Sequence, residues 1–157
     1  MLIERYEKIF MLFGGVFLAC AVAALVYSTV GGHASLPEPA GRIEPDEVRT
    51  TAPFDEPGVH ETGDGTYEVV MIAQAWQWTP QEISLPAGAE VTFTVTSVDA
   101  IHGFLVPETQ MNAMVIPGQI TQVEHTFEEP GAYSIVCHEY CGIGHHTMGG
   151  RITIEES

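Results

Sequence analysis

The chain has 157 residues, of which 45% are apolar, so it is long enough for one small folded domain and a short additional segment. Lys and Arg number 5 against 21 Asp and Glu, and the formal net charge is −16. Phosphate backbones repel a domain of that sign, which excludes nucleic acid as a partner. The acids are scattered along the chain, a pattern that favours solubility in a salty medium over a single docking patch.

Residues 10–30 form an apolar run without a charged side chain. As a helix it spans about 31 Å at about 1.5 Å per residue, which matches the hydrocarbon core of a bilayer. A cleaved signal peptide is the alternative, but its apolar region is usually only about 7–15 residues long and follows a basic segment. Here the run is longer and the preceding segment is neutral. We therefore predict an uncleaved transmembrane helix over residues 9–31.

The distribution of basic residues predicts the orientation of this helix. Arg5 and Lys8 precede it, whereas Arg42 and Arg49 lie well beyond its other end. By the positive-inside rule, residues 1–8 lie in the cytoplasm and the bulk of the chain lies outside the plasma membrane. The protein is then a single-pass membrane protein.

Two regions of different character follow the helix. Residues 32–65 are rich in Gly, Pro and acids and show no periodicity, so we expect an extended linker or an arm on the surface. From residue 66 onward, short apolar or alternating runs such as residues 91–96 are separated by Pro-Gly turn signals. This pattern predicts an all-β, antiparallel sandwich over residues 66–157.

The most informative run, residues 137–148, reads Cys-His-Glu-Tyr-Cys-Gly-Ile-Gly-His-His-Thr-Met. It places Cys137, Cys141, His145 and Met148 at intervals of four, four and three residues. Thiolates with imidazole favour copper, or zinc where the site is tetrahedral and purely Cys/His. A thioether is a poor zinc ligand but serves copper as a weak axial partner, so the pattern favours copper and electron transfer. His102, from another loop, is the candidate for a second imidazole.

Three other interpretations of the two cysteines remain. A mononuclear blue-copper site uses one Cys, and this chain offers one thiolate too many, whereas two thiolates can bridge two coppers. A disulfide is permitted outside the cytoplasm, but it gives the neighbouring His and Met residues no role. A structural zinc site from both cysteines, His102 and His145 is compatible with the spacing.

The run Cys137-x-Glu139-x-Cys141-Gly-x-x-His145-x-x-Met148, with Asp99-x-x-His102 upstream, resembles subunit II of the heme–copper cytochrome c oxidases. That family carries a binuclear copper centre, CuA, on a Greek-key cupredoxin fold. The resemblance implies that both cysteines bridge the two coppers and that each histidine binds one. It makes Met148 and the backbone carbonyl of Glu139 the weak ligands.

The resemblance also concerns the membrane segment and a second metal. Many members have two transmembrane helices, and a single helix resembles the shorter subunit II of the B-type oxidases. Those can carry Gln where this chain has Glu139. In two-helix members the matching Glu also helps to hold magnesium at the interface with subunit I, so Glu139 is a candidate magnesium ligand as well.

The segment around Trp76 and Trp78 has two interpretations. The two rings either cap the sandwich or, as the resemblance implies, lie over the copper site where electrons enter. The donor is then a cytochrome c or a small blue-copper protein. Electrons continue to a heme in subunit I, where oxygen is reduced and protons are pumped. A membrane-anchored copper-binding or copper-delivery protein without an oxidase partner is the main alternative, and a domain like that of nitrous-oxide reductase is another.

Overall fold

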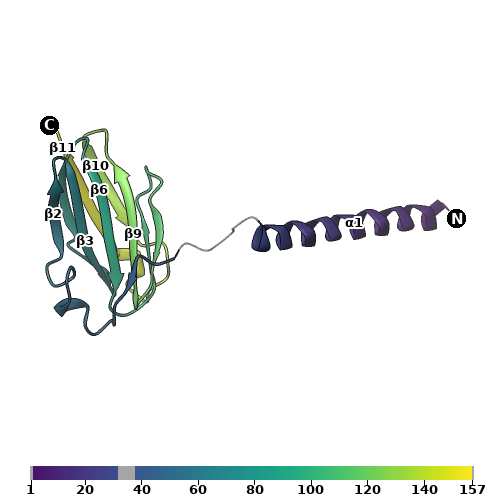
Figure 1. Ribbon diagram of the computed structural model, residues 1–157, viewed down its shortest axis with the longest axis horizontal. Coiled ribbons are helices and arrows are strands. Elements are labelled where there is room, and N and C mark those ends of the chain that lie inside the picture. Colours follow the sequence, from purple (N-terminus) through teal and green to yellow (C-terminus); the bar gives the residue numbers. More distant parts are fainter. Residues whose placement is uncertain (1, 32–37, 157) are drawn as a thin grey trace. The chain divides into compact units, whose positions relative to one another are not determined.

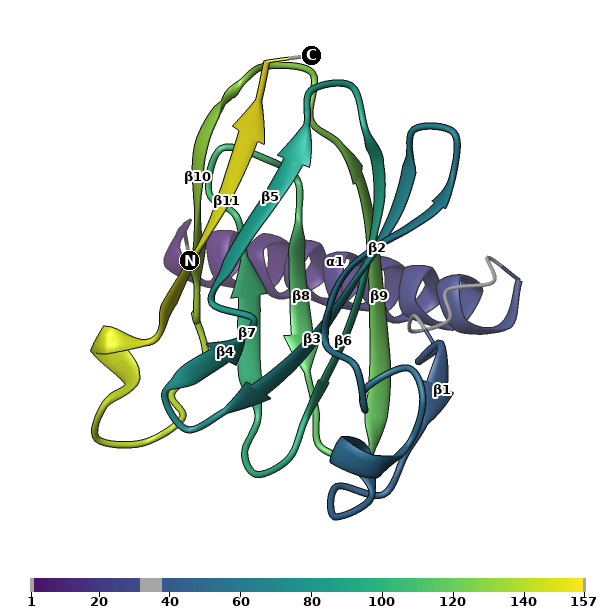
Figure 2. The same ribbon diagram turned by 90° about the vertical axis from the view of Figure 1, so that its left-hand side faces the viewer.

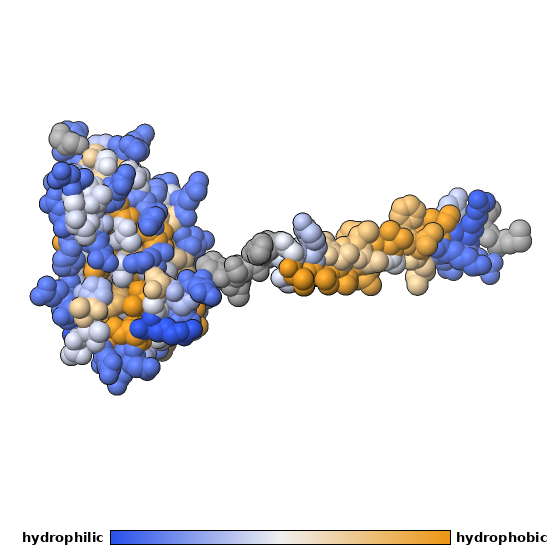
Figure 3. Space-filling view, in the orientation of Figure 1, coloured by the Kyte–Doolittle hydropathy of each residue, from blue (hydrophilic) through white to orange (hydrophobic). Residues whose placement is uncertain are grey.

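The computed structural model describes residues 2–31 and 38–156, which fall into two compact units divided between Glu38 and Pro39. The first unit consists of one helix, α1 (Leu2–Val30) (Figure 1). Its stretch from Glu4 to Val30 is long and apolar enough to cross a membrane, and the most apolar 18 residues of it have a mean hydropathy of 2.7. Figure 3 shows apolar surface along most of α1 and hydrophilic residues at its N-terminal end. The predicted N-terminal apolar helix is thus confirmed.

The second unit is a sandwich of two β-sheets. The larger sheet has the order β1-β9-β6-β3-β2, with β4 paired to β3. Its strands are β1 (Gly41–Arg42), β2 (Gly58–Gly63), β3 (Thr66–Gln74), β4 (Gln77–Thr79), β6 (Glu90–Ser97) and β9 (Gln119–Thr126). The smaller sheet has the order β5-β11-β10-β7-β8. Its strands are β5 (Glu82–Pro86), β7 (His102–Leu105), β8 (Asn112–Val115), β10 (Gly131–Val136) and β11 (Gly149–Glu155).

We had expected a purely antiparallel sandwich, but two of its strand pairs are parallel. β3 pairs with β6, and β5 pairs with β11, in parallel. The reason is the path of the chain: after β3 and β4 it crosses to the smaller sheet as β5 and then returns to the larger sheet as β6. Parallel neighbours require such a crossover, whereas hairpins join only antiparallel strands.

The main core lies between the sheets and rests on alternation within the strands. In β6, Val91, Phe93 and Val95 are buried, as their spacing of two residues predicts. The ring of Phe93 packs at 5.5 Å from that of Phe104 in the opposite sheet. Burying each such side chain contributes about 1.5–3 kcal/mol, which gives the sheets a rigid contact below the loops.

The segment that we expected to be an extended linker or an arm on the surface belongs in large part to the folded unit. It contains β1, the 3₁₀ helix η1 (Val48–Thr50) and β2, which pairs with β3. Val48 and Phe54 are fully buried, in a second small core with Val70 and Ile72 of β3. The folded unit therefore begins near Pro39 and not at residue 66. The burial comes from isolated side chains on irregular backbone, which leaves no periodicity in the sequence.

Candidate metal centre

The predicted ligands come from two loops at one end of the sandwich. In Figure 2 the loop between β10 and β11, the start of β7 and the β3–β4 turn lie together, away from the C-terminus. His102 is the first residue of β7. Cys137 directly follows β10 and, two residues after the buried Ile135, continues its inward-facing side. Strand pairing between Val136 and Leu105 holds the two ligand-bearing segments side by side.

The other predicted ligands lie on the β10–β11 loop, which contains the 3₁₀ helix η2 (His145–Thr147). The amide of His145 donates to the carbonyl of Gly142 at 3.1 Å, and the amide of Met148 donates to the carbonyl of His145 at 3.1 Å. Gly142 has φ of +118°, a conformation that favours glycine. These bonds fold the loop back, so that His145 and Met148 face the strand ends.

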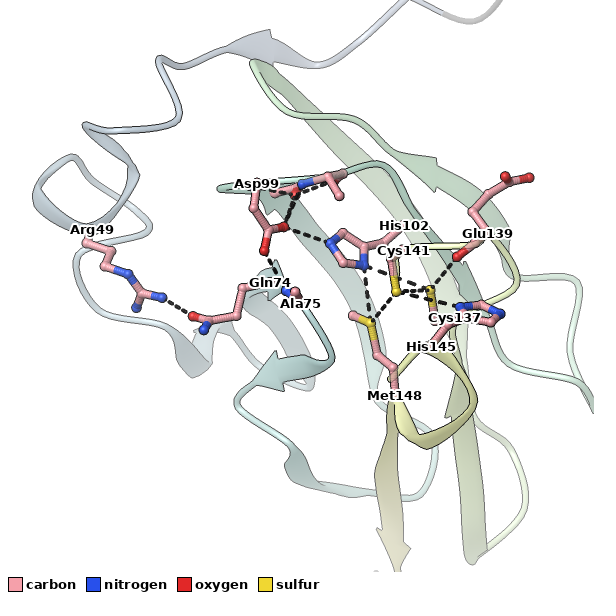
Figure 4. A network of polar contacts seen from close by, with 12 residues as sticks. Arg49, Gln74, Ala75, Asp99, His102, Cys137, Glu139, Cys141, His145 and Met148 are labelled. Carbon is pink, nitrogen blue, oxygen red and sulfur yellow. Dashed lines mark hydrogen bonds and ion pairs between the residues drawn. The ribbon is translucent and has the colours of Figure 1, made fainter. Parts of the chain in front are cut away.

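All the predicted ligands meet at one point (Figure 4). The distances between their donor atoms are Cys137 Sγ to Cys141 Sγ 3.9 Å, Cys137 Sγ to His102 Nδ1 3.9 Å, Cys141 Sγ to His145 Nδ1 3.6 Å, Cys141 Sγ to Met148 Sδ 3.6 Å, His102 Nδ1 to Met148 Sδ 3.2 Å and Cys137 Sγ to the Glu139 carbonyl 3.2 Å. Both cysteines are free thiols, since a disulfide needs its sulfurs about 2.05 Å apart. His102 is fully buried, and Cys137, Cys141 and Met148 are at most 8% exposed.

Asp99 orients His102. The imidazole Nε2 donates to Asp99 Oδ1 at 2.9 Å, which leaves the Nδ1 lone pair directed at Met148 and Cys137. Asp99 also accepts hydrogen bonds from the backbone amides of Ala75 and Ala100, each at 2.6 Å. Partial burial raises the pKa of Asp99, but the bonds from His102 and the two amides outweigh it and hold the pKa below its ordinary value.

The donor set fits a thiophilic cation. With the proton of His102 on Nε2, its Nδ1 and the sulfur of Met148 are lone-pair atoms that face each other at 3.2 Å. Burial, with a further contribution from neighbouring Cys137, raises the pKa of the Cys141 thiol to about 11. Two adjacent thiolates therefore need a positive charge between them, and soft sulfur ligands with imidazole are the chemistry that copper and zinc prefer.

The two tryptophans have different environments. Trp76 lies in the turn between β3 and β4 with 42% of its surface exposed. Its indole covers the ligand loop so closely that a Cβ atom at Gly144 would lie 2.4 Å from Cδ2 of Trp76. Trp78 is fully buried, with its ring 6.2 Å from that of His102. Only Trp76 can therefore touch a partner directly.

Glu139 presents two groups in different directions. Its backbone carbonyl faces the thiol of Cys137, whereas its carboxylate lies 3.9 Å from Nδ1 of His138. Figure 4 shows the carboxylate pointing away from the sulfur cluster. The side chain is 46% exposed, so it is accessible to a partner.

At this end of the molecule the contact of Arg49 with Gln74 was not anticipated from the sequence, and the contact of Trp76 with Gly144 shows which of the two tryptophans covers the ligand loop. Arg49 donates from Nη2 to the side-chain carbonyl of Gln74, and Trp76 packs against Gly144. Neither pair has a spacing signal, because the partners are 25 or more residues apart and meet only after the sandwich has formed.

Comparison with known proteins agrees with this fold. Residues 69–156 match the family model described as cytochrome c oxidase subunit II, periplasmic domain. A cytochrome c oxidase subunit 2 of Thermus thermophilus is 40% identical, over 98% of this chain and 94% of that relative. A second subunit 2 sequence from Thermus thermophilus is 41% identical, over 82% of this chain and 98% of that one.

Solved structures support the same assignment. A chain from the cryo-EM structure of a heme-copper terminal oxidase dimer is 33% identical with a TM-score of 0.65, over 95% of this chain and 99% of that one. The periplasmic domain of subunit II (CoxB) of Bradyrhizobium japonicum, at 21% identity and a TM-score of 0.53, covers 57% of this chain and 83% of that one and shows the shared fold. In the described residues the fold is a cupredoxin-like β-sandwich, preceded in the sequence by one apolar helix. The chain belongs to the cytochrome c oxidase subunit II family.

Proposed function

We propose that this chain is the electron-entry subunit of a heme–copper cytochrome c oxidase and holds a binuclear copper centre. One observation carries the proposal: two thiols, two imidazoles, a thioether and a backbone carbonyl converge within 4 Å contacts at one end of the sandwich. Cys137 and Cys141 would hold both coppers, and His102 and His145 would hold one each. Met148 and the Glu139 carbonyl are the weak ligands.

The chain's own residues hold the ligand side chains in a fixed arrangement and exclude water from the site. When bound, copper supplies a one-electron redox couple that needs no acid, base or nucleophile from the protein. Asp99 fixes the orientation of His102, and the hydrogen-bonded turn of η2 fixes His145 and Met148. Burial of the cysteines excludes water from their sulfurs. A site that is held in this way reorganises little on electron transfer.

We place electron entry at Trp76, because it is exposed and in contact with the ligand loop. Ile101 and Ile143 add exposed apolar surface beside His102 and within the ligand loop. The donor is a cytochrome c or a small blue-copper protein, and the acceptor is a heme in subunit I, where oxygen reduction and proton pumping take place. In a medium near molar salt the Debye length is about 3 Å, so apolar contact contributes more to docking than the acidic surface does.

The proposal includes the arrangement in the membrane. Residues 1–8 lie in the cytoplasm, residues 9–31 cross the plasma membrane, and the copper domain lies on the extracytoplasmic side. The exposed carboxylate of Glu139 contributes a ligand to magnesium at the interface with subunit I.

Purification of the tagged full-length chain in a mild detergent tests the assignment. We expect a heme-bearing membrane subunit to co-purify and copper in the complex to be reduced by a soluble cytochrome c. A chain that carries copper but brings no heme subunit from the membrane would instead support the copper-delivery alternative.

A further inference from the structure

The backbone at Trp76 adopts a conformation that needs support. Among the described residues Trp76 is the non-glycine residue with a positive φ, 124°. A bulky side chain rarely occupies that region, and such a residue persists only when its surroundings hold it there. The contacts around the Gln74–Gln77 turn should therefore include the groups that fix Trp76.

One set of contacts comes from the metal site. The amide of Trp76 donates to the Gln74 carbonyl at 2.8 Å, and the neighbouring amide of Ala75 donates to Asp99 Oδ2 at 2.6 Å. Strand pairing joins Gln74 to Gln77 across the turn. These bonds close the turn and tie one of its peptides to the carboxylate that also orients His102.

A second contact comes from the N-terminal part of the folded unit, ahead of β2. Arg49, in η1, donates from Nη2 to the side-chain carbonyl of Gln74, the last residue of β3 (Figure 4). The backbone of Arg49 is itself fixed, because the preceding residue, Val48, is fully buried in the small core with Val70 and Ile72.

The partner of Arg49 is informative because of the charge of the chain. Asp and Glu number 21 against 5 Lys and Arg, so carboxylates are plentiful. Within residues 2–31 and 38–156, however, the ion pairs involve histidines, and Arg49 is directed at a neutral amide. Because its guanidinium donates a hydrogen bond to Gln74 at the base of a strained turn, we interpret Arg49 as a residue that stabilises the turn and not only as a charge that keeps the protein soluble.

We propose that Arg49 is a positioning residue for electron entry: it holds Gln74, and through it the Gln74–Gln77 turn, so that the Trp76 indole stays against Gly142 and Gly144. The segment around η1, which precedes β2 in the folded unit, thereby contributes to the geometry of the Gln74–Gln77 turn. The consequence for electron transfer rests on the proposed role of Trp76, whereas the positioning itself does not.

Fluorine NMR of the metal-free, full-length chain in detergent, labelled with 5-fluorotryptophan, tests the positioning directly. The chain has two tryptophans, and a Trp76→Phe variant assigns their resonances. In Arg49→Met we expect the Trp76 resonance to move towards the position of a solvent-exposed indole while that of buried Trp78 stays. Arg49→Lys, which keeps a donor, should retain most of the wild-type position.

Two further variants make the test specific. Arg42→Met removes the same charge from exposed Arg42 in β1 and should leave both resonances unchanged. Gln74→Met removes the acceptor and should reproduce the shift, and combining it with Arg49→Met should add little. A Trp76 resonance that stays in place in both Arg49→Met and Gln74→Met would overturn the proposal.

The rate at which a soluble cytochrome c reduces the copper-loaded chain separates the positioning of Trp76 by Arg49 from the role of Trp76 in electron entry. In Arg49→Met we expect about a tenfold slower reduction, the order of effect of one charge-assisted hydrogen bond, with an unchanged copper spectrum and unchanged reduction by ascorbate. A shifted Trp76 resonance with an unchanged rate would support the positioning and would refute Trp76 as the entry point.

Discussion

Replacing Asp99 by Asn tests how the protein controls its buried imidazole. The Asp99 carboxylate accepts short hydrogen bonds from His102 Nε2 at 2.9 Å and from the amides of Ala75 and Ala100 at 2.6 Å each, and a longer one from Ser97 Oγ at 3.4 Å. Asn has the same shape but only one acceptor oxygen. Either its NH₂ group faces the Ala75 amide and loosens the Trp76 turn, or it faces His102 and drives the imidazole proton onto Nδ1, the atom that we propose as the metal ligand.

The magnitude follows from those bonds. Hydrogen bonds to a charged group contribute about 1.5–3 kcal/mol each, and losing a carboxylate that orients a ligating His weakens metal binding by about 10–100-fold. We expect that loss in a competition titration of the full-length chain with a copper chelator, with ¹⁵N NMR of the metal-free chain reporting the tautomer of His102. Asp64→Asn, which makes the same charge change at the exposed β2–β3 turn, is the control. Wild-type affinity together with an unprotonated Nδ1 in Asp99→Asn would refute this role of the carboxylate.

Three further predictions concern the ligand loop, the thiols and the second core. Gly144→Ala has a permitted backbone (φ −87°) but places Cβ 2.4 Å from Trp76, so the indole must move and reduction by cytochrome c should slow. The control is Gly149→Ala, whose Cβ would meet only a carbonyl at 3.5 Å and which should not slow the reduction. Equal rates of reduction in the two variants would contradict the contact between Trp76 and Gly144. Because the pKa of the metal-free Cys141 thiol is raised to about 11, copper must displace its proton, and the apparent affinity should rise about tenfold per pH unit per proton across the neutral range; a pH-independent affinity would contradict this. Phe54→Ala should lower the free energy of unfolding by about 3–5 kcal/mol in denaturant titrations, and a loss below about 1 kcal/mol would mean that the second core contributes little.

The sequence was sufficient to predict that the candidate ligands lie close together. Cys137, Cys141, His145 and Met148 lie within one loop, so their spacing alone constrains where they can point, and the structure brings them together with His102. Strand alternation likewise predicted that Val91, Phe93 and Val95 of β6 are buried, although Thr94 and Thr96 on the other face are buried as well. Both signals are local, and local periodicity survives in the folded chain.

What the sequence did not reveal depends on long-range packing. The start of the folded unit was placed too late because Val48 and Phe54 are single buried residues on irregular backbone. The Asp64-Gly65 hairpin turn between β2 and β3 was a signal that could have shifted the boundary towards the N-terminus. The contact of Arg49 with Gln74 has no such signal, since the two residues are brought together only by the packing of η1 against β3.

The proposed binuclear centre is tested most directly by counting copper and recording the EPR spectrum of the loaded full-length chain in detergent. We expect two copper ions per chain and a hyperfine pattern in which one unpaired electron is shared equally between them, with the pattern lost in Cys137→Ser and Cys141→Ser. One copper per chain with the hyperfine pattern of a single ion, or zinc alone, would contradict the binuclear assignment and with it the proposed route of electron entry.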